Sequence, residues 1–486
     1  ISALLIITFV VGTLAFPEAA NSMLNGAKAW AIEHFDWLFM VSGNIFVLFC
    51  IALAVMPTGK IRLGGQKAKP EFSTLSWFAM LFAAGMGIGL MFWSVAEPVA
   101  YLNGQWYGTP LAVEAGSEAA RHTAMGATMY HWGLHPWAIY AVVALSLAFF
   151  TYNKGMPLTI RSAFYPLLGE RVWGWPGHLI DILAVFATLF GLATSLGLGA
   201  TQAAAGLTYL FGAPESDITM ILLIIGITII ATGSIVAGVD KGVQLLSKIN
   251  IAMAAALLFF VIGVGPTLLI ATGFFENLVN YVVHLPALSN PFGREDANFS
   301  QGWTAFYWAW WISWSPYVGM FIARVSRGRT VREFLISVLL VPSVVSVLWM
   351  TTFGGTAIDQ YVSQGIEAVR DAGVDLQLFV MLEQLPLSQI TSFIAILLVI
   401  IFFVTSSDSG SLVIDSITAG GKVDAPKPQR VFWAIIEGAI AIALLLGGGL
   451  TALQTMAVST GFPFTIILLV ACYAIIKGLM SEPKAV

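Results

Sequence analysis

Tryptophan is concentrated in one short apolar stretch of the chain, residues 302–323. Five of the sixteen tryptophans lie within twelve residues, at positions 303, 308, 310, 311 and 314. In a helix, Trp310 and Trp311 are four and three residues from Trp314, so the three indoles line adjoining faces. Indole faces attract methylated cations such as trimethylammonium through the ring quadrupole. The spacing therefore indicates a pocket for an organic cation, since a strongly hydrated ion would need oxygen ligands instead.

A second aromatic group lies between His131 and Tyr140, where Trp137 and Tyr140 have i,i+3 spacing and Trp132 precedes them. The alternative is an aromatic belt at the membrane interface, the commonest place for membrane tryptophan. A belt explains residues near a helix end. It explains poorly the indoles that lie about ten residues further in, near mid-membrane. We therefore favour the pocket.

His131 and His135 are four residues apart, as two metal ligands on one helix face would be. No HExxH pattern accompanies them, and we find no carboxylate nearby on the same span. Hydrogen-bonded core histidines are the favoured interpretation.

Three alternate glycines, Gly85, Gly87 and Gly89, interrupt the apolar run 73–101. Each lowers helix stability by about 1 kcal/mol relative to Ala. Close helix packing would explain Gly85 and Gly89, which are four apart, but Gly87 adds nothing to that face. The pattern favours unwound backbone, which a bilayer tolerates only beside a cavity. Pro316 predicts a second break, at 312–316, because it lacks the backbone N–H.

Hydroxyl groups are unusually dense at 405–411, within another apolar run. Thr405 and Ser406 could bind Na⁺ together with carbonyls freed near Ala83 and Met86, and Asp408 could brace that site. The alternative is hydroxyls that bond back to their own helix. Residues 188–195 supply a second, weaker cluster: Thr188, Thr194 and Ser195.

Composition places these segments in a membrane. The chain is 58% hydrophobic and 10% charged, against about one-quarter charged in a soluble domain, and its mean hydropathy is +0.86. The net charge of −4 suggests no nucleic-acid partner. We predict an all-α integral membrane protein with twelve transmembrane helices, because the runs are too uniformly apolar for barrel strands. The apolar runs are 1–16, 36–56, 73–101, 122–152, 177–211, 217–239, 248–273, 302–323, 331–354, 388–417, 431–448 and 454–476.

Basic residues predict the orientation. In this topology 18 of the 22 Lys and Arg residues fall in cytoplasmic segments, so both termini are cytoplasmic and the chain is a multi-pass protein of the plasma membrane. The interrupted third and eighth spans are five apart, which predicts an inverted five-helix repeat preceded by two extra N-terminal helices. The predicted divisions are 1–72, a first repeat at 73–273, a surface segment at 274–301, a second repeat at 302–476 and a tail at 477–486. Within the external segments we expect an amphipathic surface helix at 275–288 and one or two short helices at 359–385.

These residues resemble the signature of the betaine/choline/carnitine transporter family. The similarity is most specific at 306–316 and 324–329, agrees at 85–89, 131–140 and 405–409, and covers essentially the whole chain. The resemblance implies the inverted-repeat transporter fold, often as a homotrimer. It implies substrate contacts from Trp132, Trp137, Tyr140, Trp310, Trp311 and Trp314, near Met86, Gly87 and Gly89, and one Na⁺ site at Ala83, Met86, Phe402, Thr405 and Ser406. Na⁺/betaine members build a second Na⁺ site from two threonines; here Thr188 matches the first, but Leu192 stands at the second.

Gly89 bears on the substrate. Choline members coupled to protons resemble this motif with Asp at that position, whereas Gly suits a zwitterion whose carboxylate approaches bare backbone amides. We predict Na⁺-coupled symport of glycine betaine or a similar quaternary ammonium zwitterion into the cell, with no cofactor and no enzymatic activity. The alternatives are H⁺-coupled choline uptake, cation-independent carnitine exchange and, more distantly, a ligand sensor that does not transport. A channel is disfavoured, since no filter segment or ring of pore charges is visible.

Overall fold

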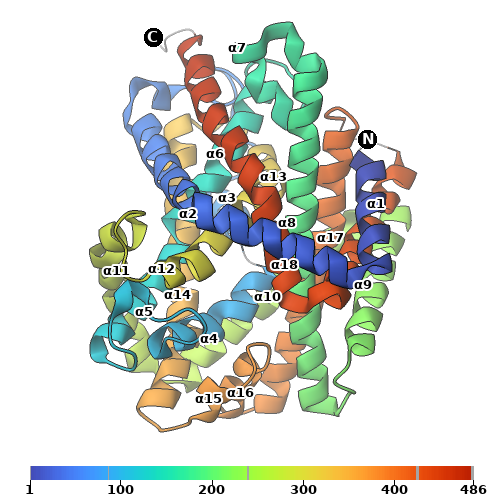
Figure 1. Cartoon of the computed structure of the whole chain (residues 1–486). Helices are drawn as coiled ribbons and strands as arrows, with labels where there is room; N and C mark the ends of the chain where they lie inside the picture. Colours follow the sequence, from blue (N-terminus) through green and yellow to red (C-terminus); the bar gives the residue numbers. More distant parts are fainter. Residues whose placement is uncertain (1, 86, 238–239, 423–425, 483–486) are drawn as a thin grey trace.

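The computed structural model describes residues 2–85, 87–237, 240–422 and 426–482, and within them it contains helices and no strand (Figure 1). The first half contains α1 (Ser2–Ala15), α2 (Pro17–Val55), α3 (Thr74–Gly85), α4 (Ile88–Asn103), α5 (Glu118–Trp132), α6 (Leu134–Tyr152), α7 (Tyr165–Leu168), α8 (Trp175–Phe211), α9 (Asp217–Ala237) and α10 (Asp240–Val264). The second half contains α11 (Thr267–Ser289), α12 (Ala297–Phe299), α13 (Ala305–Val325), α14 (Val331–Val362), α15 (Ala368–Asp371), α16 (Gln377–Glu383), α17 (Ser388–Thr418) and α18 (Lys427–Met480).

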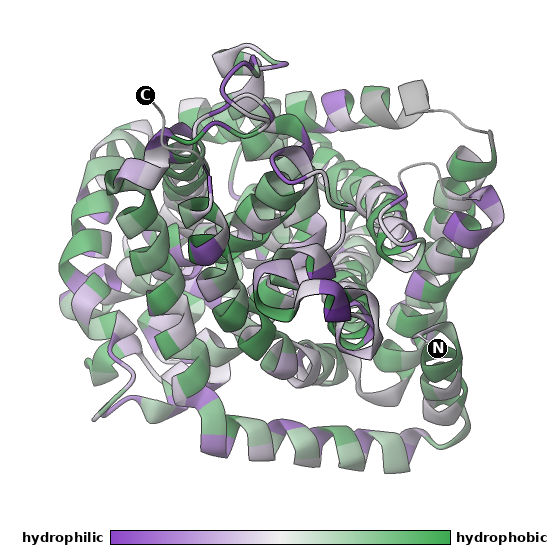
Figure 2. Ribbon diagram, turned by 90° about the horizontal axis from the view of Figure 1, so that it is seen from above, coloured by the Kyte–Doolittle hydropathy of each residue, from purple (hydrophilic) through white to green (hydrophobic). Residues whose placement is uncertain are grey.

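In the described part of the chain, nine helical stretches are long and apolar enough to cross a membrane, judged by length and composition. Figure 2 shows hydrophobic residues around the periphery of the helices, and large side chains such as Ile229 and Phe259 are exposed there. Lipid is the solvent that such a surface requires. The prediction of an all-helical membrane protein is confirmed.

The count of twelve spans and the inverted repeat stay predictions. The helices differ from the predicted runs in three places. The run 73–101 is divided between α3 and α4, each too short to cross alone, and 122–152 is divided between α5 and α6. Helix α18 contains the two predicted spans 431–448 and 454–476. Gly448 and Gly449 separate those two spans, since neither has helical dihedral angles.

The predicted break at the alternating glycines is confirmed. Helix α3 ends at Gly85, and α4 begins at Ile88 after an extended Gly87 with φ −158° and ψ −174°. Met86 lies outside the described residues. The chain therefore supplies a helix N-terminus in the interior of the molecule, with backbone N–H groups that no preceding turn satisfies.

The predicted break at 312–316 is wrong, because α13 is continuous through Pro316. Proline removes the N–H that would bond the carbonyl of Ile312. The hydroxyl of Ser315 replaces that donor, at 2.6 Å from the Ile312 oxygen. A satisfied carbonyl removes the main reason for the helix to open. From Ala305 to Pro316 every side chain of α13 is buried.

Two further helices extend beyond their predicted limits. Helix α2 begins at Pro17 rather than near residue 36, and its dihedral angles depart from helical values at Phe35. Figure 1 shows its first part crossing the other helices before the chain turns. Helix α11 covers the predicted surface helix and starts earlier, at Thr267; its position on the membrane surface stays a prediction. The short helices expected at 359–385 are confirmed as α15 and α16.

Candidate functional site

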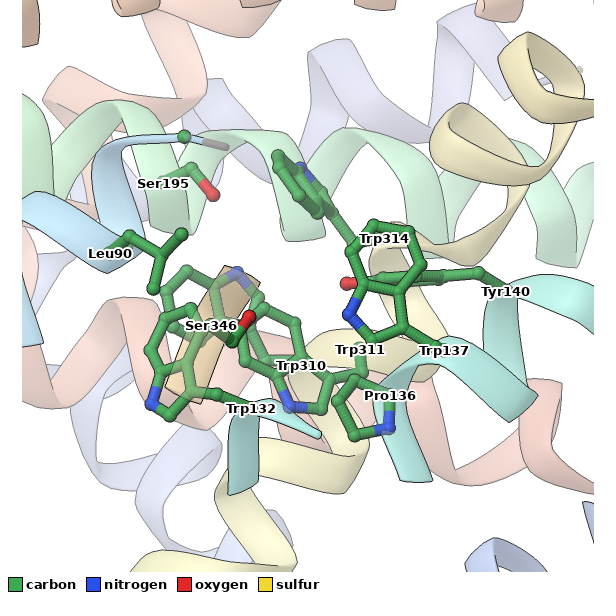
Figure 3. A pocket seen from close by; sticks show the side chains of 12 residues that line it. Leu90, Trp132, Pro136, Trp137, Tyr140, Ser195, Trp310, Trp311, Trp314 and Ser346 are labelled. Atoms are coloured by element: carbon green, nitrogen blue, oxygen red, sulfur yellow. The ribbon is translucent and has the colours of Figure 1, made fainter. Parts of the chain in front are cut away.

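One pocket in the interior gathers the predicted aromatic residues from three helices. Trp132 ends α5, Trp137 and Tyr140 lie on α6, and the remaining tryptophans lie on α13. The space between the atoms of the pocket, including the part that opens to solvent, is about 390 Å³ (Figure 3). Its lining consists of Gly87, Gly89, Leu90, Trp132, Pro136, Trp137, Tyr140, Ser195, Trp310, Trp311, Trp314 and Ser346.

The rings that line the pocket pack on one another both face to face and edge to face. Trp310 and Trp311 stack with centroids 4.6 Å apart and planes at 14°, while Trp132 meets Trp311 edge-on at 4.9 Å and 69°. Tyr140 lies 6.4 Å from Trp314. Each of the five pocket indoles is at most 6% exposed. A lipid-facing belt would leave such rings exposed, so this geometry favours the pocket over the belt.

The glycines of the broken span let α4 approach these rings. A Cβ added to Gly89 would lie 2.8 Å from the six-membered ring of Trp310 and 3.0 Å from that of Trp132. At Gly87 the corresponding distance to Trp314 is 3.3 Å. In Figure 3, Leu90 of α4 lies at the opposite end of the pocket from Tyr140. The helix N-terminus and the aromatic walls therefore belong to one site.

A buried carboxylate behind the pocket orients Trp132. Glu97 of α4 is fully buried, and its Oε2 accepts hydrogen bonds from Trp132 Nε1 at 2.7 Å and from the Tyr307 hydroxyl at 2.5 Å. Its Oε1 lies 3.0 Å from His131 Nδ1, which also bonds the Tyr101 hydroxyl at 2.8 Å. With its oxygens bonded in this network, Glu97 acts as a brace for the aromatic wall.

Sequence reasoning missed this brace, and it missed Leu90, Pro136 and Ser346 in the lining. The signal for Glu97 was available, because a carboxylate within an apolar run is a functional candidate by default. The i,i+4 spacing of His131 and His135 suggests a shared role, but in the structure they have different partners. His131 bonds Glu97, whereas His135 bonds Asn44 Oδ1 at 2.9 Å and stacks on Trp308. Both histidines are hydrogen-bonded core residues, as favoured above.

We expect Glu97→Leu to weaken substrate binding and to lower stability by about 3 kcal/mol, because it leaves two buried donors unpaired. Glu97→Gln keeps an acceptor for Trp132 and Tyr307, so it should retain most of the binding. Thermal unfolding and substrate titration of the purified variants measure both effects. Equal loss in the Leu and Gln variants would show that Glu97 does not act through these hydrogen bonds.

The residues predicted for Na⁺ line a second, larger cavity of about 1540 Å³, including the part that opens to the surface. Ala83, Phe402, Thr405 and Ser406 all contribute to it, and Trp314 lines both cavities. Met86, the fifth predicted ligand, lies outside the described residues. The structure thus brings four of the five predicted residues to one cavity, which shares Trp314 with the aromatic pocket.

The hydroxyl of Thr405 donates to the carbonyls of Ile401 at 2.9 Å and Phe402 at 3.2 Å. In this state it bonds its own helix, which was the alternative for this cluster. Thr188 likewise donates to Ala184 at 2.7 Å, and it does not line either cavity. Leu192 packs against Gly410 of α17. The structure therefore adds no support for a second Na⁺ site.

Comparison with known proteins shows similarity to transporters over nearly the whole chain. A model of the betaine/carnitine/choline transporter family matches residues 1–484. A glycine betaine/proline/choline transporter of Vibrio parahaemolyticus is 60% identical, covering 100% of this chain and 90% of its own length. Glycine betaine transporter 1 of the same organism is 59% identical, covering 99% of this chain and 93% of its own length. A glycine betaine transporter of Acinetobacter baylyi is 42% identical, covering 99% of this chain and 73% of its own length. This chain belongs to the betaine/carnitine/choline transporter family, and it is a membrane transporter rather than an enzyme.

Proposed function

We propose that the protein imports glycine betaine or a similar quaternary ammonium zwitterion across the plasma membrane, driven by Na⁺. The observation that carries the proposal is an aromatic pocket with no charged residue in its described lining, to which the N-terminus of α4 contributes Gly87, Gly89 and Leu90. Such a pocket complements a molecule whose positive and negative charges cancel. The names of both relatives include glycine betaine, and the first also includes proline and choline.

The two ends of a zwitterion need different partners, and the pocket offers both. The ring faces of Trp310 and Trp311 attract the trimethylammonium group. Hydrogen-bond donors for a carboxylate are available from the N–H groups at the start of α4, from the hydroxyls of Ser195 and Ser346 and from Trp314 Nε1, which has no partner among the described residues. The favourable end of the α4 dipole also points toward negative charge.

Choline lacks the carboxylate and would leave those donors unused. A site that binds choline better would be expected to place a negative charge in the lining, and the described lining contains no carboxylate, since Glu97 bonds Trp132 but is not a lining residue. This arrangement favours betaine over choline. H⁺-coupled choline uptake and carnitine exchange are therefore alternatives that the transport assay must separate.

The proposed coupling ion binds beside the substrate. The cavity that contains Thr405 and Ser406 shares Trp314 with the aromatic pocket, so an ion there could change the position of a wall that the substrate touches. The proposal includes cytoplasmic termini, which the distribution of Lys and Arg predicts, and a homotrimer, which the family resemblance implies.

Uptake of radiolabelled betaine by proteoliposomes tests the proposal. With Na⁺ outside, we expect saturable accumulation that stops when K⁺ replaces Na⁺. Accumulation unchanged in K⁺ would remove Na⁺ coupling and favour exchange or proton coupling. Tight betaine binding without accumulation would favour a sensor.

A matched pair of variants ties the ion requirement to the predicted site. Ser406→Ala should raise the Na⁺ concentration for half-maximal uptake about tenfold, since loss of one ligand oxygen costs about 1–2 kcal/mol. Ser409→Ala, which removes a hydroxyl from the same cavity but not from the predicted ligand set, should leave it unchanged. If the two variants changed the Na⁺ dependence equally, Ser406 would not be a specific Na⁺ ligand.

A further inference from the structure

A second fully buried glutamate lies away from the aromatic pocket, on the first half of α18. Glu437 is 0% exposed. Its Oε2 accepts a hydrogen bond from the hydroxyl of Ser407 on α17 at 3.1 Å, and its Oε1 has no hydrogen-bond partner among the described residues. A carboxyl group within a membrane segment is costly to keep, so it indicates a function.

The charges around Glu437 do not compensate an ionised carboxylate. Asp408 of α17 is close enough to interact electrostatically with Glu437, and it pairs with Arg430 of α18 at 3.1 Å. Tyr317 of α13 is also within electrostatic reach of both acids. A second negative charge beside Asp408, away from water, would be repelled and poorly solvated.

Among the described residues, helices α8 and α9 bring a leucine and a threonine to this region, neither of which titrates. A Cβ added to Gly410 of α17 would lie 2.4 Å from Leu192 of α8 and 3.3 Å from Glu437 Oε1, so the carboxyl and the leucine meet over this glycine. Helix α9 brings Thr228 against Gly438, the residue after Glu437. A Na⁺ ion needs several oxygen ligands, which this apolar wall does not supply. A proton needs only one.

We propose that Glu437 is a proton-binding site of the transporter. Its carboxylate takes up one proton from solution and becomes a neutral acid when α8, α17 and α18 pack around it. No described hydrogen bond joins it to the residues predicted for Na⁺, because Ser407 faces α18 while Ser406 lines the cavity on α17. The site is therefore distinct from the predicted Na⁺ site.

The consequence rests on the proposed transport function. At high pH the proton is lost, an uncompensated charge remains between the helices, and the packed state becomes less stable. Uptake at a fixed Na⁺ gradient should therefore fall as the pH rises. Glutamine has the shape of the neutral acid and cannot ionise, so Glu437→Gln should transport betaine at a rate that does not depend on pH through this group.

Proteoliposomes with equal pH inside and outside provide the test. Between about pH 6 and about pH 9, wild-type uptake should fall several-fold, while Glu437→Gln stays near the rate that the wild type has at the lower pH. Glu367→Gln serves as the control, because Glu367 is an exposed acid with a side chain 72% accessible, and it should keep the wild-type profile. A Glu437→Gln profile identical to the wild type would overturn the proposal and leave betaine transport standing.

Infrared spectroscopy can detect the proton on the Glu437 carboxyl group without a transport assay. The wild-type protein should show the carbonyl band of a protonated carboxylic acid that disappears at high pH and is absent in Glu437→Gln. Ser407→Ala removes only its hydrogen-bond donor, so it should shift the frequency of that band even if the glutamine variant fails to fold. A wild-type spectrum without a band that responds to Ser407→Ala would overturn the proposal.

Discussion

Replacing Trp311 with Leu is expected to weaken betaine binding about 30-fold, with little loss of folded protein. The indole forms the centre of the aromatic pocket, because it stacks on Trp310 and meets the edge of Trp132. A desolvated cation over an indole face gains about 2 kcal/mol, which corresponds to about 30-fold in Kd. Leu keeps an apolar surface but has no quadrupole. The loss of the bond from Trp311 Nε1 to the His131 carbonyl, 3.0 Å long, should cost about 1 kcal/mol of stability.

Two variants separate the ring face from general packing. Trp311→Phe keeps a smaller aromatic face and should give an intermediate Kd. Trp349→Leu removes an indole that is equally buried on α14 but lies outside the pocket, where it packs against Phe353. Isothermal titration of the three purified proteins measures the difference. Binding unchanged in Trp311→Leu, or lost equally in Trp349→Leu, would remove Trp311 from the substrate site.

Replacing Gly89 with Ala should reduce betaine affinity by about 10-fold to 100-fold, although it adds a single methyl group. That methyl would lie 2.8 Å from Trp310 and 3.0 Å from Trp132, too close for either ring to stay in place. Overpacking of this kind costs about 1–3 kcal/mol. Here the cost falls on two walls of the pocket, so the rings move into the space of the ligand.

Gly87→Ala is the matched control for this effect. Its methyl would meet only Trp314, at 3.3 Å, which a small movement of the ring can relieve. The affinity should therefore fall much less than in Gly89→Ala, while both variants unfold at similar temperatures. Equal affinities in the two variants would show that the spacing between α4 and the aromatic wall does not determine binding.

The general architecture could be predicted from composition and local pattern, but the detailed shape of the helices could not. Three alternate glycines predicted the break between α3 and α4, since glycine weakens a helix by a local mechanism. The break predicted at Pro316 is wrong because a local signal was compensated by a neighbouring residue. The missing N–H of Pro316 is a local signal for a break, yet the neighbouring Ser315 satisfies the freed carbonyl. The first part of α2 was missed because it extends beyond the continuous apolar run.

For the site as well, contacts within one helix could be predicted from the sequence, but contacts between distant segments could not. Spacing along one helix predicted that Trp310, Trp311 and Trp314 share a pocket. It could not reveal the partners of Glu97, because its hydrogen bonds to Trp132 and Tyr307 span 35 and 210 residues of sequence. Nor could it reveal Ser346, which reaches the pocket only through the packing of α14.

An isostere of the substrate that lacks the positive charge tests the aromatic pocket most directly. In 3,3-dimethylbutanoate a carbon replaces the nitrogen of glycine betaine, so the shape and the carboxylate remain and the positive charge is gone. If ring faces bind the cation, this compound should compete with radiolabelled betaine about 30-fold less well than betaine itself, or worse. Competition as strong as that of betaine would show that the pocket recognises only shape and carboxylate, and that its indoles do not bind a cation.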